Sequence, residues 1–301
     1  MSITTGTVQI ANATTARRAA DFFELTKPRI VFMVLITALV GYYAGSARVP
    51  EYLRLLQMLF GTALAAAGTL TLNQFLERDI DGLMERTRRR PLPDSRVQPQ
   101  DALWFGTLLT AAGLIYLILS VNLLSAMVAG VITVTYLFVY TPMKRYSALC
   151  VPIGAVPGAL PPVIGWVAAR GDLSVDAWIL FAIMFLWQIP HTLAIAYLYR
   201  EDFAKAGIQF LPVIDPNGAS MNRQVLMHCG ALWVVSFLPT LIGIAGALYF
   251  VTAFFLGAAF LSSGIKLVLT PSRASARRLL FASLIYLPML LLVMALDLLP
   301  A

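Results

Sequence analysis

Charged residues are scarce in this sequence, and so are cysteine and histidine. Only 12% of the 301 residues are Asp, Glu, Lys or Arg, which is about half of the roughly 25% found in soluble domains. This scarcity excludes a water-soluble globular protein, because too little charge remains to cover its surface. The two cysteines, Cys150 and Cys229, lie in or beside apolar segments and have no ligand-like spacing, which argues against a disulfide framework or a zinc site.

Two further patterns are missing. Residues 1–29 contain no apolar core of the length that a secretory signal needs, so we expect a polar cytoplasmic tail with a short interfacial helix near residues 16–25. The apolar runs elsewhere do not alternate between apolar and polar residues. This excludes a membrane β-barrel, whose strands are short segments with such alternation.

Apolar sequence is abundant: 59% of the residues are hydrophobic, and the mean hydropathy is +0.79. The runs approach or exceed the roughly 20 residues that a membrane-spanning helix needs. We therefore predict an all-α fold, a polytopic membrane helical bundle with nine transmembrane helices in a single domain, residues 30–299. The predicted spans are approximately 30–47, 53–76, 102–120, 123–141, 149–169, 174–198, 226–247, 249–268 and 279–299. Two loops are long, 77–101 and 199–225.

The basic residues test this topology, because cytoplasmic loops are enriched in Lys and Arg. With the N-terminus in the cytoplasm, 19 of the 22 basic residues fall on the cytoplasmic side, and only Arg48, Arg54 and Arg170 fall on the other. This split predicts a bacterial inner-membrane protein with a periplasmic C-terminus and both long loops in the cytoplasm. It also explains the net charge of +7 without a nucleic-acid partner.

The end of the second span is unusually polar. Asn73, Glu77 and Asp81 are four residues apart, so they share one face if the helix continues. Such oxygen ligands suit Mg²⁺, which is typically held by one or two carboxylates together with substrate phosphates. The arginines that follow can bind diphosphate through bidentate guanidinium contacts. The alternative is a solvated loop whose charges pair with one another and with lipid headgroups.

The stretch "NQFLERDIDGLMERTRRRPLP" (73–93) resembles the first signature of the UbiA-type intramembrane prenyltransferases, and within them it is most similar to the heme O synthase family. "LTKPRI" (25–30), "YTPMKRYS" (140–147), "IGAVPGALPPVIGW" (153–166) and "WQIPHTLAIAYLYREDFAKAGIQFLPV" (187–213) extend the resemblance over most of residues 21–299. Three positions depart from the pattern. Gln74 replaces a common second acid, Glu77 replaces an aspartate, and Phe203 replaces the family's usual tyrosine.

The second half of the pattern is less complete. Most other UbiA relatives carry Asp-x-x-x-Asp before the glycine that corresponds to Gly207, but here those positions are Tyr199 and Phe203. Only Asp202, with Glu201 beside it, offers an acid in this stretch. A lone membrane histidine such as His191 is often hydrogen-bonded to a neighbouring helix, and the resemblance raises contact with a heme as the alternative.

The resemblance implies transfer of the farnesyl group of farnesyl diphosphate to a vinyl group of protoheme (heme B), giving heme O. The predicted site residues fall into three groups. They are Mg²⁺ ligands and catalytic residues (Asn73, Glu77, Asp81 and Asp202), diphosphate-binding residues (Arg78, Arg90, Lys144, Arg145 and Lys205), and heme-binding residues (His191, Gln188 and Trp187). Expected partners are membrane lipid and either heme A synthase or an oxidase assembly factor. Two rival functions stay open: another UbiA-type aromatic prenyltransferase of the quinone or chlorophyll pathway, and a transporter.

Overall fold

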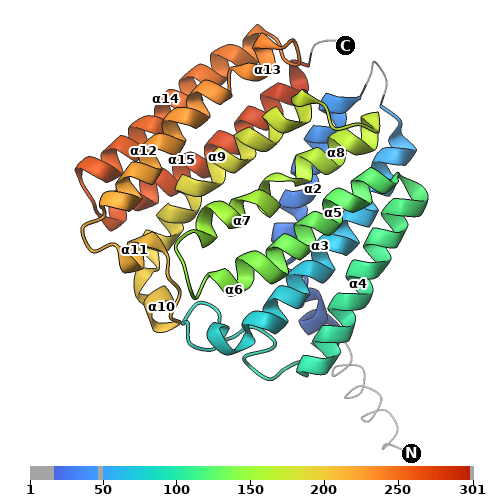
Figure 1. Cartoon of the computed structure of the whole chain (residues 1–301), viewed down its shortest axis with the longest axis vertical. Coiled ribbons are helices and arrows are strands. Elements are labelled where there is room, and N and C mark those ends of the chain that lie inside the picture. Colours follow the sequence, from blue (N-terminus) through green and yellow to red (C-terminus); the bar gives the residue numbers. More distant parts are fainter. Residues whose placement is uncertain (1–16, 47–49, 299–301) are drawn as a thin grey trace, which may run out of the picture.

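The computed structural model describes residues 17–46 and 50–298. Within these residues nine helical spans are long and apolar enough to cross a membrane, so the predicted nine-span helical bundle is confirmed (Figure 1). Six spans are single helices: α2 (Pro28–Gly45), α3 (Tyr52–Asp81), α4 (Pro99–Ser120), α9 (Val175–Leu198), α14 (Ala247–Leu269) and α15 (Arg273–Leu296).

The other three spans are composite. The fourth contains α5 (Leu123–Val134), the π-helix η1 (Thr135–Tyr140) and α6 (Thr141–Met143); the fifth contains α7 (Cys150–Ala159) and α8 (Pro161–Arg170); the seventh contains α12 (Ala219–Val235) and α13 (Leu238–Leu241). Two short helices, α10 (Arg200–Lys205) and α11 (Leu211–Ile214), lie between α9 and α12.

Two predicted loop boundaries are wrong. Helix α3 continues to Asp81 instead of ending near residue 76, so the start of the predicted loop 77–101 is helical. Helix α12 begins at Ala219 instead of residue 226, which shortens the predicted loop 199–225. The reason is the same in both places, because apolar sequence marks the membrane-buried part of a helix while backbone hydrogen bonding continues beyond it.

Small residues let two helix pairs approach closely, as is typical of membrane bundles. Helices α2 and α8 cross so tightly that a Cβ atom on Gly41 would lie 1.9 Å from the carbonyl oxygen of Pro162. In the α3–α4 pair, a Cβ atom on Gly113 would lie 2.4 Å from the backbone nitrogen of Ala65. These two pairs fix the walls around the cavities described below.

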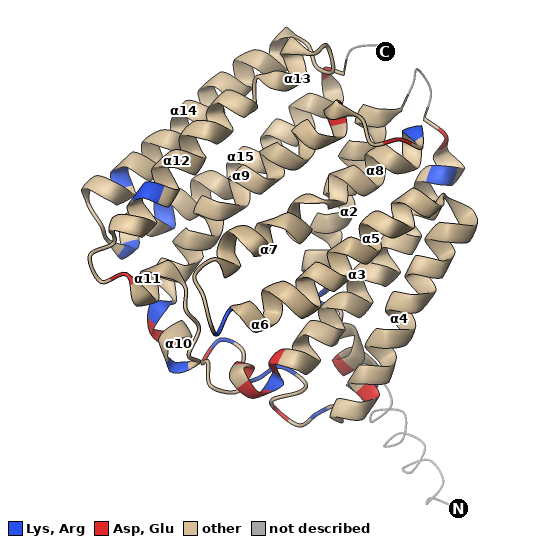
Figure 2. Ribbon diagram, viewed as in Figure 1, with Lys and Arg blue, Asp and Glu red and all other residues tan. Residues whose placement is uncertain are grey.

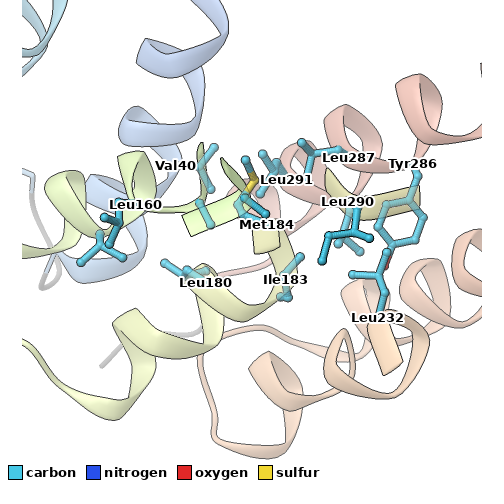
Figure 3. Close-up of a cluster of buried hydrophobic side chains, with 14 of the residues drawn as sticks. Val40, Leu160, Leu180, Ile183, Met184, Leu232, Tyr286, Leu287, Leu290 and Leu291 are labelled. Atoms are coloured by element: carbon cyan, nitrogen blue, oxygen red, sulfur yellow. The ribbon is translucent and has the colours of Figure 1, made fainter. Parts of the chain in front are cut away.

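The C-terminal half packs through larger apolar side chains. Figure 3 shows such a cluster, to which α2 contributes Val40, α9 contributes Ile183, α12 contributes Leu232 and α15 contributes Leu290. Tyr286 in the same cluster is buried, and its hydroxyl lies 2.5 Å from Ser236 Oγ. A buried hydroxyl therefore has a partner, as an apolar interior requires.

Charged residues gather at one end of the bundle (Figure 2), around α6, α10, α11 and the segment that follows α3. At the opposite end few basic residues occur, Arg54 and Arg170 among them. Arg48, the third basic residue assigned to that end, lies outside the described residues. The charge distribution agrees with the sequence prediction, and the side of the membrane that each end faces stays a prediction.

Candidate active site

A polar cavity of about 180 Å³ lies at the charged end of the bundle. Asn73, Glu77 and Asp81 line it together, because α3 stays helical through these residues and keeps the four-residue spacing on one face. All three side chains are buried, with exposed fractions of 1%, 7% and 2%. The predicted polar face of the second span is therefore an internal surface, and the reading of it as a solvated loop is excluded for these three residues.

Each of these three side chains accepts a hydrogen bond from a different basic residue. Lys27 Nζ donates to Asn73 Oδ1 (2.9 Å), Lys144 Nζ donates to Glu77 Oε1 (2.6 Å), and Arg90 Nη1 donates to Asp81 Oδ2 (2.7 Å). An isolated buried charge would be strongly destabilising, so these pairings explain how α3 carries two carboxylates into the bundle. The amide of Asn73 is oriented by a second bond, from its Nδ2 to Thr141 Oγ1 (3.0 Å).

The electrostatic environment differs between the two lysines. Burial, with help from the positive charge of Arg90, lowers the pKa of Lys27 to about 7. Burial also acts to lower the pKa of Lys144, but Tyr140 and Glu77 outweigh it and hold that pKa above its ordinary value. Lys144 is therefore firmly cationic, whereas the charge of Lys27 depends strongly on its surroundings.

Arg86 is a fourth basic residue that lines the polar cavity. Its guanidinium lies over the rings of Tyr199 and Phe203, at 5.6 and 5.9 Å from their centroids. Burial and the nearby charge of Arg90 lower the pKa of Arg86. The lining thus contains four basic side chains and two carboxylates, and this excess of positive charge suits a polyanionic ligand.

An apolar cavity of about 250 Å³ adjoins the polar one. Tyr136, Tyr140 and Thr192 line both cavities. The two tyrosines belong to the π-helix η1, and their ring centroids lie 5.3 Å apart. Beyond them the walls are mostly apolar residues of α2, α3, α5, α7 and α8, including Val34, Ala66 and Gly158. The pair of cavities could therefore take a molecule with an anionic head and an apolar tail.

Four of the predicted Mg²⁺- and diphosphate-binding residues lie outside the lining of the polar cavity. Arg78 follows Glu77 directly and so points about 100° away around α3; its guanidinium lies over the ring of Phe75 and donates to the Phe75 carbonyl oxygen (2.9 Å). Arg145 and Lys205 are exposed, and Asp202 is half-buried on α10. The structure brings only Arg90 and Lys144 of the five predicted diphosphate-binding residues to this cavity.

The three predicted heme-binding residues on α9 face two directions. Gln188 lines the apolar cavity. Trp187 and His191 contact α15 instead: Trp187 Nε1 donates to the Ser283 carbonyl oxygen (2.9 Å), and His191 Nδ1 lies 2.7 Å from Ser283 Oγ. The Ser283 hydroxyl donates to the Leu280 carbonyl oxygen (2.6 Å). The Ser283 oxygen therefore accepts a hydrogen bond from His191 Nδ1–H. The other ring nitrogen, Nε2, then carries a lone pair and takes no part in this hydrogen bond.

The predicted set of site residues omits Lys27 and Arg86, which the structure places in the polar cavity, and the tyrosine pair. Lys27 belongs to "LTKPRI" (25–30), one of the stretches that carry the resemblance, but a lysine at a membrane edge is also expected from topology alone. Arg86 is one of several arginines in "ERTRRRP" (85–91), and nothing in that run distinguishes the residue that faces inward. Tyr136 and Tyr140 have helical four-residue spacing, which is equally typical of core packing.

The chain is an intramembrane prenyltransferase: it belongs to the UbiA prenyltransferase family, and the match covers residues 34–285. It is 46% identical over 286 residues to a relative named protoheme IX farnesyltransferase from Solibacter usitatus (strain Ellin6076), covering 92% of this chain and 98% of the relative.

Solved structures share the fold at low identity. A structure described for digeranylgeranylglyceryl phosphate synthase has a TM-score of 0.77 at 19% identity, covering 93% of this chain and 98% of that chain. A UbiA homolog from Archaeoglobus fulgidus bound to GPP and Mg²⁺ has a TM-score of 0.59 at 16% identity, covering 91% and 99%. Both likenesses concern the arrangement of the helices.

Proposed function

We propose that this chain transfers the farnesyl group of farnesyl diphosphate to a vinyl group of heme B, producing heme O and diphosphate. The observation that carries the proposal is the cation-rich polar cavity, which adjoins an apolar cavity at Tyr136 and Tyr140. The choice of acceptor is supported by the relative that shares 46% of its residues with this chain and is named protoheme IX farnesyltransferase.

The diphosphate head would bind in the polar cavity. Lys27, Arg90 and Lys144 now donate to residues of α3, and these donors could turn to phosphate oxygens when a diphosphate enters. Arg86, held against two aromatic rings, would add a fourth guanidinium or ammonium contact. Charge-assisted hydrogen bonds of this kind are stronger than neutral ones.

Asn73, Glu77 and Asp81 carry the oxygen donors that would hold a magnesium ion. Two carboxylates and an amide share one face of α3, and Mg²⁺ typically takes one or two carboxylates with phosphate oxygens and water. Among residues 17–46 and 50–298 no group of three or more His, Cys, Asp or Glu side chains could hold a metal, so substrate oxygens would have to complete the ligand set. When bound, Mg²⁺ would neutralise charge on the leaving diphosphate. Asp202 stays outside this proposed set because it does not line the cavity.

The reaction breaks the allylic C–O bond, and its electron pair leaves with the diphosphate. The vinyl π electrons of the heme form the new C–C bond, and water then adds to the resulting cation with loss of a proton, which leaves a hydroxyethylfarnesyl group. Lys144 and Arg90 would stabilise the leaving group. The faces of Tyr136 and Tyr140 can stabilise an allylic cation, while the apolar cavity would hold the tail and keep water away from that cation.

We propose His191 as a residue that contacts the heme, as the family resemblance implies. Its Nδ1–H bond to Ser283 fixes the imidazole tautomer, and a second hydrogen-bond partner of this kind is typical of histidines that ligate metals. The stacked ring of Trp187, with centroids 4.6 Å apart, holds the imidazole plane. We therefore propose that Nε2 is directed toward heme iron, with Gln188 nearer the prenyl tail.

One assay separates the proposed function from its rivals. Membranes containing the chain would be incubated with Mg²⁺, heme B and farnesyl diphosphate, and the products analysed by mass spectrometry. Farnesylated heme is the expected product. A prenylated phenol from added quinone precursors would indicate a different UbiA-type enzyme, and solute flux without any product would indicate a transporter.

By the positive-inside rule, the polar cavity would open on the cytoplasmic side of a bacterial inner membrane.

A further inference from the structure

The N-terminal segment is part of the polar cavity although its helix lies outside the bundle. Residues 17–25 are helical, as predicted from sequence for 16–25, with residue 16 outside the described range. Lys27 follows after Thr26, with a left-handed backbone (φ 50°, ψ 61°). This conformation costs a non-glycine residue about 1–2 kcal/mol and precedes Pro28, so the surrounding contacts must hold Lys27 in place.

Two contacts hold the segment immediately before Lys27. Gln74, buried beside Asn73 on α3, donates from Nε2 to the carbonyl oxygen of Leu25 (2.7 Å). The Leu25 side chain is fully buried in a small apolar cluster with Leu92 and Val97. The helix therefore docks on the segment that follows α3, and this second apolar cluster is separate from the main core.

Arg96 links the N-terminal helix to that same segment. Its guanidinium donates to Asp21 Oδ1, to Glu24 Oε2 (3.0 Å) and to Asp94 Oδ2 (3.2 Å). It also donates to the Arg89 carbonyl oxygen (2.8 Å). A single side chain thus connects two carboxylates of the N-terminal helix with a carboxylate and a carbonyl of residues 82–98.

The two segments that Arg96 joins each deliver a cation to the polar cavity. The N-terminal segment delivers Lys27, and residues 82–98 deliver Arg86 and Arg90. Arg96 itself does not line the cavity and lies 23% exposed on the outside. We propose that Arg96 is a positioning residue for prenyl diphosphate binding: it holds the N-terminal helix so that Lys27 and Arg90 face the same phosphate groups. The proposal rests on the proposed function of the cavity.

The test compares Arg96→Ala and Arg96→Lys with a matched control, Arg88→Ala. Arg88 belongs to the same segment and pairs with Glu85 at the surface, where such pairs contribute little. Binding of farnesyl diphosphate with Mg²⁺, without heme, would be measured on the purified chain, together with KM and kcat. We expect Arg96→Ala to raise Kd and KM about tenfold, the loss of roughly one charge-assisted contact, with a smaller change in kcat. Arg96→Lys should lie between wild type and Arg96→Ala, and Arg88→Ala should stay within about twofold of wild type.

The double variant Lys27→Ala/Arg96→Ala separates positioning from general stability. If Arg96 acts through Lys27, removing Arg96 in the Lys27→Ala background should raise KM by less than about twofold, because coupled residues are not additive. An undiminished effect in that background, or binding by Arg96→Ala equal to wild type, would overturn the role of Arg96. If Arg96→Ala does not fold, the effect of Arg96→Lys on KM is compared instead between the wild-type and Lys27→Ala backgrounds. Failure of the wild-type chain to bind farnesyl diphosphate would instead count against the proposed function itself.

Hydrogen exchange tests independently whether Arg96 holds the N-terminal helix in place. Amides of residues 21–27 should exchange faster in Arg96→Ala than in wild type, since the helix loses its charged anchor. Arg88→Ala should leave these amides unchanged. Unchanged exchange in Arg96→Ala would show that Leu25 and Gln74 suffice to hold the segment, and the positioning role would then be wrong.

Discussion

Two parts of the polar cavity lining, one from α3 and the other from α9 and α10, carry different chemistry. Helix α3 contributes an amide and two carboxylates, whereas α9 and α10 contribute Thr192, Ile195 and Phe203. Both segments are followed in the sequence by basic residues and a Leu-Pro pair, so from sequence they look like two versions of one pattern. The structure shows that only the first version places acids inward. The metal-binding chemistry is therefore expected on one wall, while the other wall shapes the cavity.

The largest effect is expected when a carboxylate is removed from the α3 side of the polar cavity, called the charged wall below. Asp81→Ala deletes a buried carboxylate and leaves Arg90 without its partner. We expect kcat for prenyl transfer to fall at least about a hundredfold, comparable with loss of one preorganised electrostatic group in an active site. The matched control is Asp79→Ala two residues earlier, whose side chain is 86% exposed and whose loss should leave turnover unchanged. Equal activity of both variants would remove Asp81 from the site.

Lys144 tests the pairing on the charged wall with an intermediate effect. Lys144→Met should weaken farnesyl diphosphate binding by roughly tenfold to a hundredfold, as expected for a hydrogen bond to a charged group. It should also lower the thermal stability, because Glu77 then stays buried without its cation. In Lys144→Met/Glu77→Gln the unfolding temperature should recover while activity does not. Recovery of both would show that the pair is only structural.

The smallest expected effect lies on the other wall. Asp202→Ala removes the acid of the second pattern that was predicted as a Mg²⁺ ligand. Its side chain does not line the cavity, so turnover should fall by less than about threefold, the scale of most surface substitutions. A loss as large as that of Asp81→Ala would mean that α10 moves inward when substrate binds. The charged wall would then extend to both sides, and the comparison between the two helices would be wrong.

The sequence predicts the bundle well because membrane insertion depends on local apolar composition. It also predicts the face formed by Asn73, Glu77 and Asp81, since helical spacing alone brings these residues together. Tertiary contacts are harder to predict. No local signal relates Lys27 to Asn73 across 46 positions, and no periodicity separates Arg86 and Arg90 from Arg78, because residues after α3 follow no regular helix. The left-handed backbone at Lys27 depends on contacts that only folding creates.

The π-helix η1 in the fourth span carries Tyr136 and Tyr140 and, through α6, leads to Lys144. Such wide turns are rare and are frequently found at functional sites, and here η1 lies between α5 and the short helix α6, which Lys144 follows. Deleting one residue from this turn would still leave a span long enough to cross the bilayer. It would nevertheless rotate α5 by about 100° relative to Lys144. A one-residue insertion or deletion that hydropathy could not register would thus turn the α5 residues that line the apolar cavity, such as Ala129 and Thr133, away from the contacting pair Tyr140 and Lys144.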